Sequence, residues 1–136
     1  MTQTLLQIAA ACLLDAQGRL LLVRKRGTQA FMLPGGKREP GEAPLQALRR
    51  ELQEELGLEL PEAALSELGH FRAPAANEAD TWVAADLYLA RLEQPVAAAA
   101  ELEELAWLAP GEALPATLAP LLRDHVLPAL SARNAF

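Results

Sequence analysis

The clearest pattern of apolar and polar positions lies between residues 43 and 56, where leucines recur every three or four residues. This spacing places them on one face of a helix, with polar residues on the other faces. Pro44 suits the first turn of such a helix, where its missing N–H has no partner to lose. Gly57 follows directly and suits a left-handed C-terminal cap. The segment predicts an amphipathic helix whose apolar face consists of Leu45, Leu48, Leu52 and Leu56.

Apolar runs bounded by turn residues predict strands before and after this helix. The expected strands cover residues 6–14, 19–24, 65–71, 81–92 and 102–108, and a turn at 15–18 joins the first two. A second amphipathic helix is predicted to begin with Thr117 as its N-cap, and we expect Pro128 to kink or end it. Strands combined with two helices favour an α/β layered fold. Because no repeat or linker divides residues 1–136, we expect a single domain.

Three glutamates stand on the rim of the first predicted helix, beside its apolar face. Glu51, Glu54 and Glu55 cover an arc of about 100° on the helical wheel. Arg50 precedes Glu54 by four residues, close enough to pair with it. Crowded carboxylates raise one another's pKa unless a cation is present, and a hard divalent ion such as Mg²⁺ prefers oxygen ligands. The cluster is therefore a candidate metal site suited to diphosphate chemistry, although by itself it is also typical of a solvated helix face.

A longer motif surrounds these glutamates. A glycine turn is predicted at residues 34–37, where the backbone can approach a ligand closely. From Gly36 to Leu58 the sequence reads G-x5-E-x7-R-E-L-x-E-E-x-G-L, in which Glu42 is the first glutamate that the motif specifies. This spacing resembles the Nudix box of the Nudix hydrolase family at all nine specified positions, and Phe31 differs from the Trp that many members carry. The full spacing favours the metal-site interpretation over the solvated face.

The resemblance implies a fold and a set of metal ligands. The implied fold is a Nudix-type α/β/α sandwich with a mixed β-sheet. Glu54 and Glu55 would coordinate the metal ion, which is Mg²⁺ or alternatively Mn²⁺. Glu51 would be either a further ligand or the general base, and the main-chain carbonyl of Gly35 would join the metal shell.

Two other box residues receive supporting roles. In the family the box arginine orients the following glutamate by an ion pair, which assigns this role to Arg50 here. Glu42 lies at the start of the helix, where a carboxylate suits the helix dipole and the free N–H groups. We therefore interpret Glu42 as structural rather than chemical.

A further catalytic carboxylate is expected outside the box. In many members it lies six residues before a tryptophan, so Trp107 indicates Glu101, with Glu103 and Glu104 as rivals. All three could also be plain surface charges. Trp107 is itself a candidate contact for the nucleobase, and a packed core tryptophan is an equally good interpretation.

Basic residues near the glycine turn are candidates for binding substrate phosphates. Arg24, Lys25 and Arg26 end the second predicted strand, and in similar enzymes such residues contact the phosphates. Side chains alternate along a strand, so Arg24 and Arg26 would share a face. Lys37, just after the turn, is a further candidate. Solvated charges at a strand end are the alternative interpretation.

The resemblance implies a metal-dependent pyrophosphohydrolase that cleaves the diphosphate linkage of a nucleoside diphosphate derivative. The spacing of residues 33–58 resembles MutT-like enzymes and favours clean-up of (d)NTPs. Pro74 resembles a proline associated with ADP-ribose hydrolases, so an ADP-ribose or other sugar-nucleotide pyrophosphatase is a close alternative. A non-catalytic nucleotide-sensing module is an alternative of another class. Such members often lose the box carboxylates, which are all present here.

Composition narrows the partners. The net charge of −6 disfavours broad binding to nucleic acid or to an anionic membrane. The resemblance to the family implies a small nucleotide as the partner. The one cysteine, Cys12, cannot form an internal disulfide, which suits a reducing cytoplasm. The apolar run at residues 5–14 is too short to span a membrane, so we expect no targeting segment and a cytoplasmic location. Many similar proteins are dimers, and a homodimer is compatible with this chain.

Overall fold

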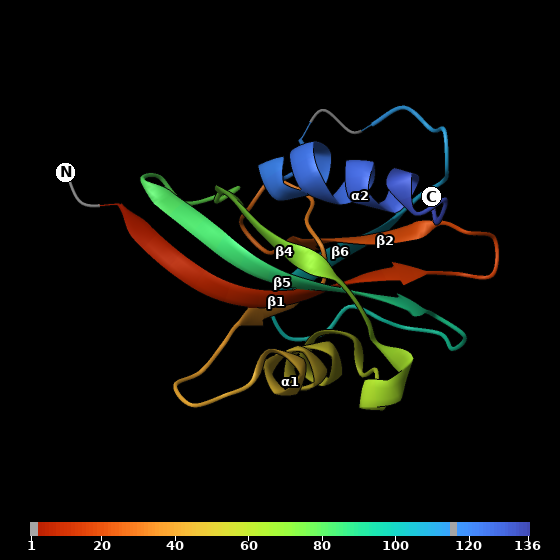
Figure 1. Ribbon diagram of the computed structural model, residues 1–136, viewed down its shortest axis with the longest axis horizontal. Coiled ribbons are helices and arrows are strands. Elements are labelled where there is room, and N and C mark those ends of the chain that lie inside the picture. The colour runs from red at the N-terminus through yellow and green to blue at the C-terminus, as the bar shows by residue number, and fades with distance from the viewer. Residues whose placement is uncertain (1–2, 115–116) are drawn as a thin grey trace.

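A mixed six-stranded β-sheet lies between two helical layers (Figure 1). The computed structural model describes residues 3–114 and 117–136. Helix α1 (Pro44–Leu56) covers one face of the sheet, and a helical segment ending with α2 (Leu127–Ala132) covers the other. This arrangement confirms the predicted α/β/α sandwich with a mixed sheet. The strands are β1 (Thr4–Leu14), β2 (Leu20–Lys25), β3 (Gly35–Lys37), β4 (Ser66–Pro74), β5 (Thr81–Arg91) and β6 (Leu102–Leu108).

The strand order places β1 at the centre of the sheet. The order is β4-β5-β1-β2-β6, with β3 also paired to β1. The β1 and β5 strands are parallel, and the other pairs are antiparallel. Ile8 of β1 is opposite Lys37 of β3 and opposite Ala85 of β5. The start of the box is therefore attached to the middle of the sheet.

Each face of the sheet has its own core because successive side chains of a strand point to opposite faces. On one face, Leu13 of β1 belongs to the same core as Leu52 of α1. On the other face, Cys12 belongs to a core with Leu122 and Leu130. Cys12 is fully buried and unpaired, as expected for a core residue.

Helix α1 begins and ends where the sequence predicts. Pro44 occupies its first turn, and Gly57 caps its C-terminus with φ 63° and ψ 26°, in the left-handed region. The Gly57 N–H donates to the carbonyl of Gln53, which satisfies one free end of the helix. Within residues 3–114 and 117–136, no helix is long and apolar enough to cross a membrane.

Two local predictions were wrong, and one of the two alternatives given for Pro128 is excluded. Residues 35–37 form strand β3 rather than a turn, because they pair with β1. Thr117 is not an N-cap: its carbonyl accepts the Phe31 N–H, and the π-helix Leu122–Val126 starts later. Pro128 does not end the helix, which continues to residue 132 as α2. The π-helical turn directly precedes α2, in whose first turn the proline needs no N–H partner.

Candidate active site

Strand β3 brings the glycine pair into contact with helix α1. A Cβ atom added at Gly36 would lie 2.5 Å from Cδ of Glu51, so only glycine leaves room for that carboxylate. Gly35 has φ 144°, and a Cβ atom there would lie 2.2 Å from the carbonyl oxygen of Ala9 in β1. The two glycines therefore serve different contacts: Gly35 lets the backbone approach β1, and Gly36 lets it approach the Glu51 side chain.

Arg50 holds several groups around the start of α1. Its Nε and Nη2 atoms donate to the two carboxylate oxygens of Glu42 at 2.9 and 3.0 Å. Its Nη1 donates to Glu51 Oε1 at 3.0 Å, and Nη2 also donates to the carbonyl of Lys37 at 3.1 Å. The expected pair with Glu54 is longer, at 3.8 Å. Arg50 thus connects the glycine-containing strand, the loop before α1 and the Glu51 carboxylate.

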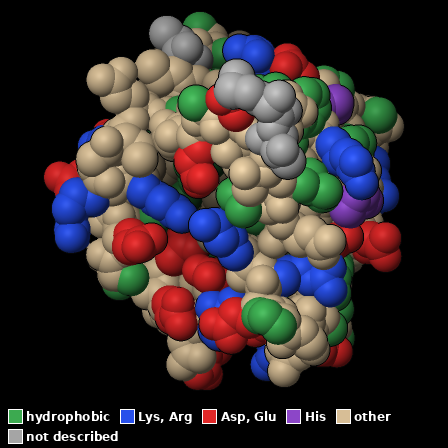
Figure 2. Space-filling model, turned by 90° about the vertical axis from the view of Figure 1, so that its left-hand side faces the viewer, with side chains coloured by type: hydrophobic (Ala, Val, Ile, Leu, Met, Phe, Trp, Pro, Cys, Tyr) green, Lys and Arg blue, Asp and Glu red, His purple; other side chains and the backbone are tan. Residues whose placement is uncertain are grey.

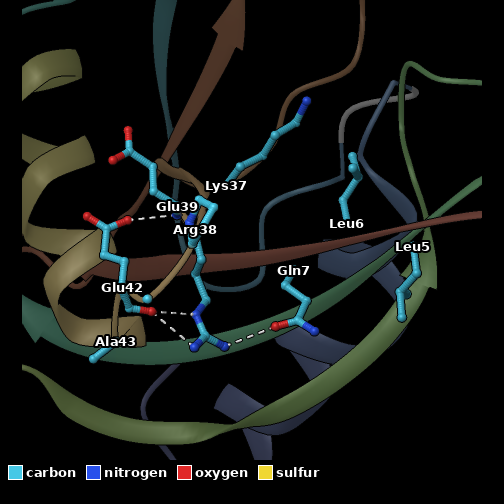
Figure 3. Close-up of a pocket in the computed structure, with 10 residues that line it drawn as sticks. Leu5, Leu6, Gln7, Lys37, Arg38, Glu39, Glu42 and Ala43 are labelled. Carbon is cyan, nitrogen blue, oxygen red and sulfur yellow. Dashed lines mark hydrogen bonds between the residues drawn. The ribbon is translucent and has the colours of Figure 1, made fainter.

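Glu42 is fully supplied with hydrogen-bond donors. Besides the Arg50 guanidinium, it accepts the Glu39 N–H at 2.9 Å (Figure 3). The hydrogen bonds from Arg50, followed by the one from Glu39, lower the pKa of Glu42 to about 2. The prediction of a structural role is consistent with this geometry. The partners differ from those expected, because Glu42 binds Arg50 rather than the free N–H groups of the helix.

Arg38 completes the support of the same loop. It donates from Nε and Nη2 to the Glu42 carbonyl, and from Nη1 to the Gln7 side chain at 3.2 Å (Figure 3). The contact between Arg38 and Gln7 therefore ties the loop before α1 to β1. The Lys37 side chain takes no part in these hydrogen bonds and points away from them in the same view.

Glu55 has the opposite environment. Its side chain is buried, with the residue only 5% exposed, and neither carboxylate oxygen has a hydrogen-bond partner. Burial and the nearby Glu51 carboxylate raise the pKa of Glu55 to about 8, although Lys25 and the Gly35 backbone act in the other direction. A buried carboxylate without a partner is costly. Its two carboxylate oxygens are the kind of ligand that a hard cation prefers, and neither is engaged by a hydrogen-bond donor, so this residue fits a metal ligand.

The other two glutamates of the helix cluster both lie near Arg50, and Glu51 also lies near Glu55. The Glu51 side chain is mostly buried against Gly36, whereas Glu54 is 57% exposed. Within residues 3–114 and 117–136, no group of three or more His, Cys, Asp or Glu side chains is gathered as a ready metal site. The structure therefore places Glu51 near Glu55, leaves Glu54 largely exposed and leaves Glu55 without a hydrogen-bond partner.

The basic and acidic trios outside the box pair with each other. Strands β2 and β6 are antiparallel neighbours, so the end of one lies beside the start of the other. The N–O distances are 3.0 Å for Arg24–Glu104, 3.9 Å for Lys25–Glu101 and 3.5 Å for Arg26–Glu103. Arg24 also donates to the Thr28 carbonyl at 2.8 Å. Glu101 is 80% exposed in its side chain and makes the longest of the three pairs.

A cavity of about 270 Å³ opens beside the glycine pair. Its walls are mostly apolar, and its cations are Lys25 and Lys37. Figure 2 shows basic and acidic side chains in adjacent groups on the left-hand face of Figure 1. Of the three residues predicted to bind phosphate, Lys37 lines this cavity, whereas Arg24 and Arg26 do not.

Trp107 lies on the opposite face of the sheet from this cavity. It packs at the edge of the core on the α1 side, with the Arg19 guanidinium 5.4 Å from its ring centre. The cavity is lined by residues of the opposite face, such as Ile8 and Leu121. The structure does not bring Trp107 to the cavity, and its contacts are those of a packed tryptophan.

Sequence reasoning missed Lys25 as an individual site residue. The pattern singled out Arg24 and Arg26 because they would share a strand face. The β2–β6 ladder changes register between Arg24 and Lys25, which breaks the simple alternation. Position within a basic trio was the only available signal, and it could not distinguish the three residues.

Comparisons with known proteins identify the family of this chain. Residues 5–130 match the family model described as the NUDIX domain. An 8-oxo-dGTP diphosphatase of Haemophilus influenzae is 37% identical over 78 residues, which cover 54% of this chain and 57% of that protein. The aligned part therefore spans little more than half the length of that relative.

Solved structures share the fold over nearly the whole chain. A MutT NUDIX hydrolase from Burkholderia pseudomallei is 26% identical with a TM-score of 0.73, covering 95% of this chain and 98% of that one. The NUDIX domain of Shewanella oneidensis NrtR, complexed with ADP ribose, is 22% identical with a TM-score of 0.71. That match covers 98% of this chain and 88% of the other, and it shows a common fold.

Proposed function

The chain belongs to the NUDIX domain family, and on that basis we propose that it is a metal-dependent pyrophosphohydrolase. Its substrate would be a nucleoside diphosphate derivative. The observation that carries this proposal is Glu55, a buried carboxylate without any hydrogen-bond partner beside the glycine pair. A buried carboxylate of this kind needs a compensating positive charge, and the family's box supplies further carboxylates near it.

The proposed metal ligands are Glu54, Glu55 and the main-chain carbonyl of Gly35, and Glu51 is a further ligand if it is not the general base. The ion would be Mg²⁺, with Mn²⁺ as the alternative, because both are hard cations that prefer oxygen ligands. When bound, such an ion neutralises diphosphate charge and makes the phosphorus easier to attack.

The protein's own side chains would position and deprotonate the attacking water. In hydrolysis, the water oxygen bonds to phosphorus, the bridging P–O bond breaks, and the water gives its proton to a base. We assign this base to Glu51 rather than Glu101, because Arg50 and Gly36 hold the Glu51 carboxylate beside the glycine pair. Glu101 is exposed and paired with Lys25, so its support for the base role is weaker. Arg50 acts as the positioning residue.

The substrate is proposed to be a (d)NTP. The cavity supports this, because Lys25 and Lys37 can neutralise phosphates while its apolar walls suit a nucleobase. The diphosphatase name of the Haemophilus relative agrees with this class. A sugar nucleotide such as ADP-ribose is the alternative, supported by the ligand of the NrtR structure.

A nucleotide-sensing role without catalysis is less well supported. All the box carboxylates are present, and Arg50 holds Glu51 in place. A binding module would need neither the intact box nor the unpaired Glu55. The single domain, the homodimer and the cytoplasmic location stay predictions of the sequence.

The test is a nucleotide panel offered to the purified protein with Mg²⁺, with Mn²⁺ and with a chelator. Canonical (d)NTPs, 8-oxo-dGTP and ADP-ribose should be compared by chromatography of the mononucleotide and by assays of phosphate and pyrophosphate. We expect (d)NTP hydrolysis that requires the metal ion. Preferential cleavage of ADP-ribose would transfer the assignment to the alternative. No hydrolysis of any nucleotide with either metal would contradict the enzyme assignment.

A further inference from the structure

The cavity beside the glycine pair has two chemically different ends. Strand β1 forms its floor, with β3 on one side and β5 on the other. Lys25 and Lys37 line it on the β3 side. The loop between β4 and β5 lines it through residues 75–78. A bound nucleotide would therefore have its phosphates near the lysines and its other end near this loop.

The space between these ends suits a flat ring. The floor and walls consist of aliphatic side chains, among them Leu6, Ile8, Met32 and Val83. A sugar would bring several hydroxyl groups, each of which needs a hydrogen-bond partner when it is buried. Aliphatic walls offer none, whereas a nucleobase has apolar faces and carries its polar atoms on its edge.

The loop supplies polar atoms where that edge would lie. Asn77 and Glu78 both line the cavity and are exposed to solvent. Across residues 3–114 and 117–136, neither side chain makes a hydrogen bond or an ion pair with another residue. Both are free to bind a ligand. Thr28, on the other side of the cavity, already donates its hydroxyl to the Lys25 carbonyl.

We propose that Glu78 is a specificity-determining residue that selects bases of the guanine type, an inference that rests on the proposed function. An ionised carboxylate only accepts hydrogen bonds. The guanine edge presents two adjacent donors, N1–H and the N2 amino group, and can satisfy both carboxylate oxygens. The adenine edge places the N1 acceptor beside its amino group, so one carboxylate oxygen would face a lone pair. Asn77, which is donor and acceptor, is compatible with either base.

The experiment measures nucleotide binding separately from hydrolysis. Binding of dGMP and dAMP should be followed by titration calorimetry for the wild type, Glu78→Gln and Asp80→Asn. Asp80 lies in the same loop but does not line the cavity, so Asp80→Asn removes the same charge without altering the cavity. The kcat/KM values for dGTP and dATP then report whether the same preference holds in turnover.

We expect the wild type to bind dGMP more tightly than dAMP. Glu78→Gln should reduce this preference by about tenfold or more, because a charged hydrogen-bond acceptor is lost. Asp80→Asn should leave the preference unchanged. An unaltered ratio in Glu78→Gln, an equal loss in Asp80→Asn, or no dGMP preference in the wild type would overturn the inference. Such a result would leave the hydrolase assignment intact, whereas selective dGMP binding without hydrolysis would contradict the hydrolase assignment alone.

Discussion

Two glutamates of the box lie at opposite ends of α1 and have opposite environments. Glu42, just before the helix, receives two hydrogen bonds from Arg50 and one from the Glu39 N–H. Glu55, in the last turn, is buried and receives none. The pKa of Glu42 is lowered to about 2, and that of Glu55 is raised to about 8. The sequence motif specifies glutamate at both positions, yet the fold satisfies only one.

This difference separates Glu42, which has a structural role, from Glu55, which can bind a ligand. A carboxylate whose hydrogen bonds are complete holds the loop and Arg50 in place and has little capacity left for a ligand. A carboxylate left without partners is a cost that the fold retains, as is common at functional sites. The four predictions that follow test this separation.

The largest effect is expected at the unpaired end. Glu55→Gln should lower metal-dependent hydrolysis about 100- to 1000-fold, because metal binding supplies several kcal/mol of charge stabilisation. Glu54→Gln should lower it similarly. Steady-state kinetics with Mg²⁺ measures the loss, and circular dichroism checks the fold. The matched control is Glu42→Gln, which should retain Mg²⁺-induced thermal stabilisation that Glu55→Gln loses. Unchanged turnover in both Glu54→Gln and Glu55→Gln would contradict their proposed role as metal ligands, and with it the functional difference between Glu55 and Glu42.

A smaller loss of turnover is expected when the Glu51 carboxylate is displaced from its position. Gly36→Ala places a Cβ atom against that carboxylate, so turnover should fall about tenfold or more, with little change in melting temperature. Gly35→Ala should instead destabilise the protein, because its Cβ atom would collide with the β1 backbone. Melting curves and kinetics on the two variants distinguish these outcomes. Equal effects on stability would contradict the separate roles of the two glycines.

Glu42 and Glu55 should change the free energy of unfolding at opposite ends of the pH range. Glu55 has a folded-state pKa of about 8 against an ordinary 4.5, so the metal-free protein should lose stability as pH rises between these values. Each pKa unit corresponds to about 1.4 kcal/mol. Glu42 has a lowered pKa, so its contribution is present above 4.5 and is lost as pH falls toward 2.

Denaturant unfolding with a chelator, from about pH 3 to pH 9, measures this profile. Glu55→Gln should flatten the alkaline side, and Glu42→Gln should flatten the acidic side. If the metal-free wild type keeps its full stability at pH 8, the pKa of Glu55 is not raised by burial in the folded protein.

The smallest effect is expected at the paired surface charges. Arg26→Ala should change the free energy of unfolding by about 1 kcal/mol or less, because its pair with Glu103 is solvent-exposed. Its turnover should be close to that of the wild type. Lys25→Ala, by contrast, should raise KM because Lys25 lines the cavity. Equal kinetic effects of the two substitutions would contradict a separate role for Lys25 within the basic trio.

Local spacing determined much of this protein. The leucine repeat, Pro44 and Gly57 predicted α1 to within a residue, because a helix is specified by neighbours three and four positions apart. The same local spacing placed Glu51, Glu54 and Glu55 on one side of that helix. It also carried the resemblance to the family, whose defining motif is one continuous segment.

Tertiary structure decided which charges are compensated. Arg50 reaches Glu42 eight residues away, and the basic and acidic trios meet only through the pairing of β2 with β6. The strand character of residues 35–37 depends on β1, which lies far away in the sequence. Burial of Glu55 depends on the packing of α1 against the sheet. Spacing along the chain can place carboxylates together, but only the packed fold determines which of them lacks a partner.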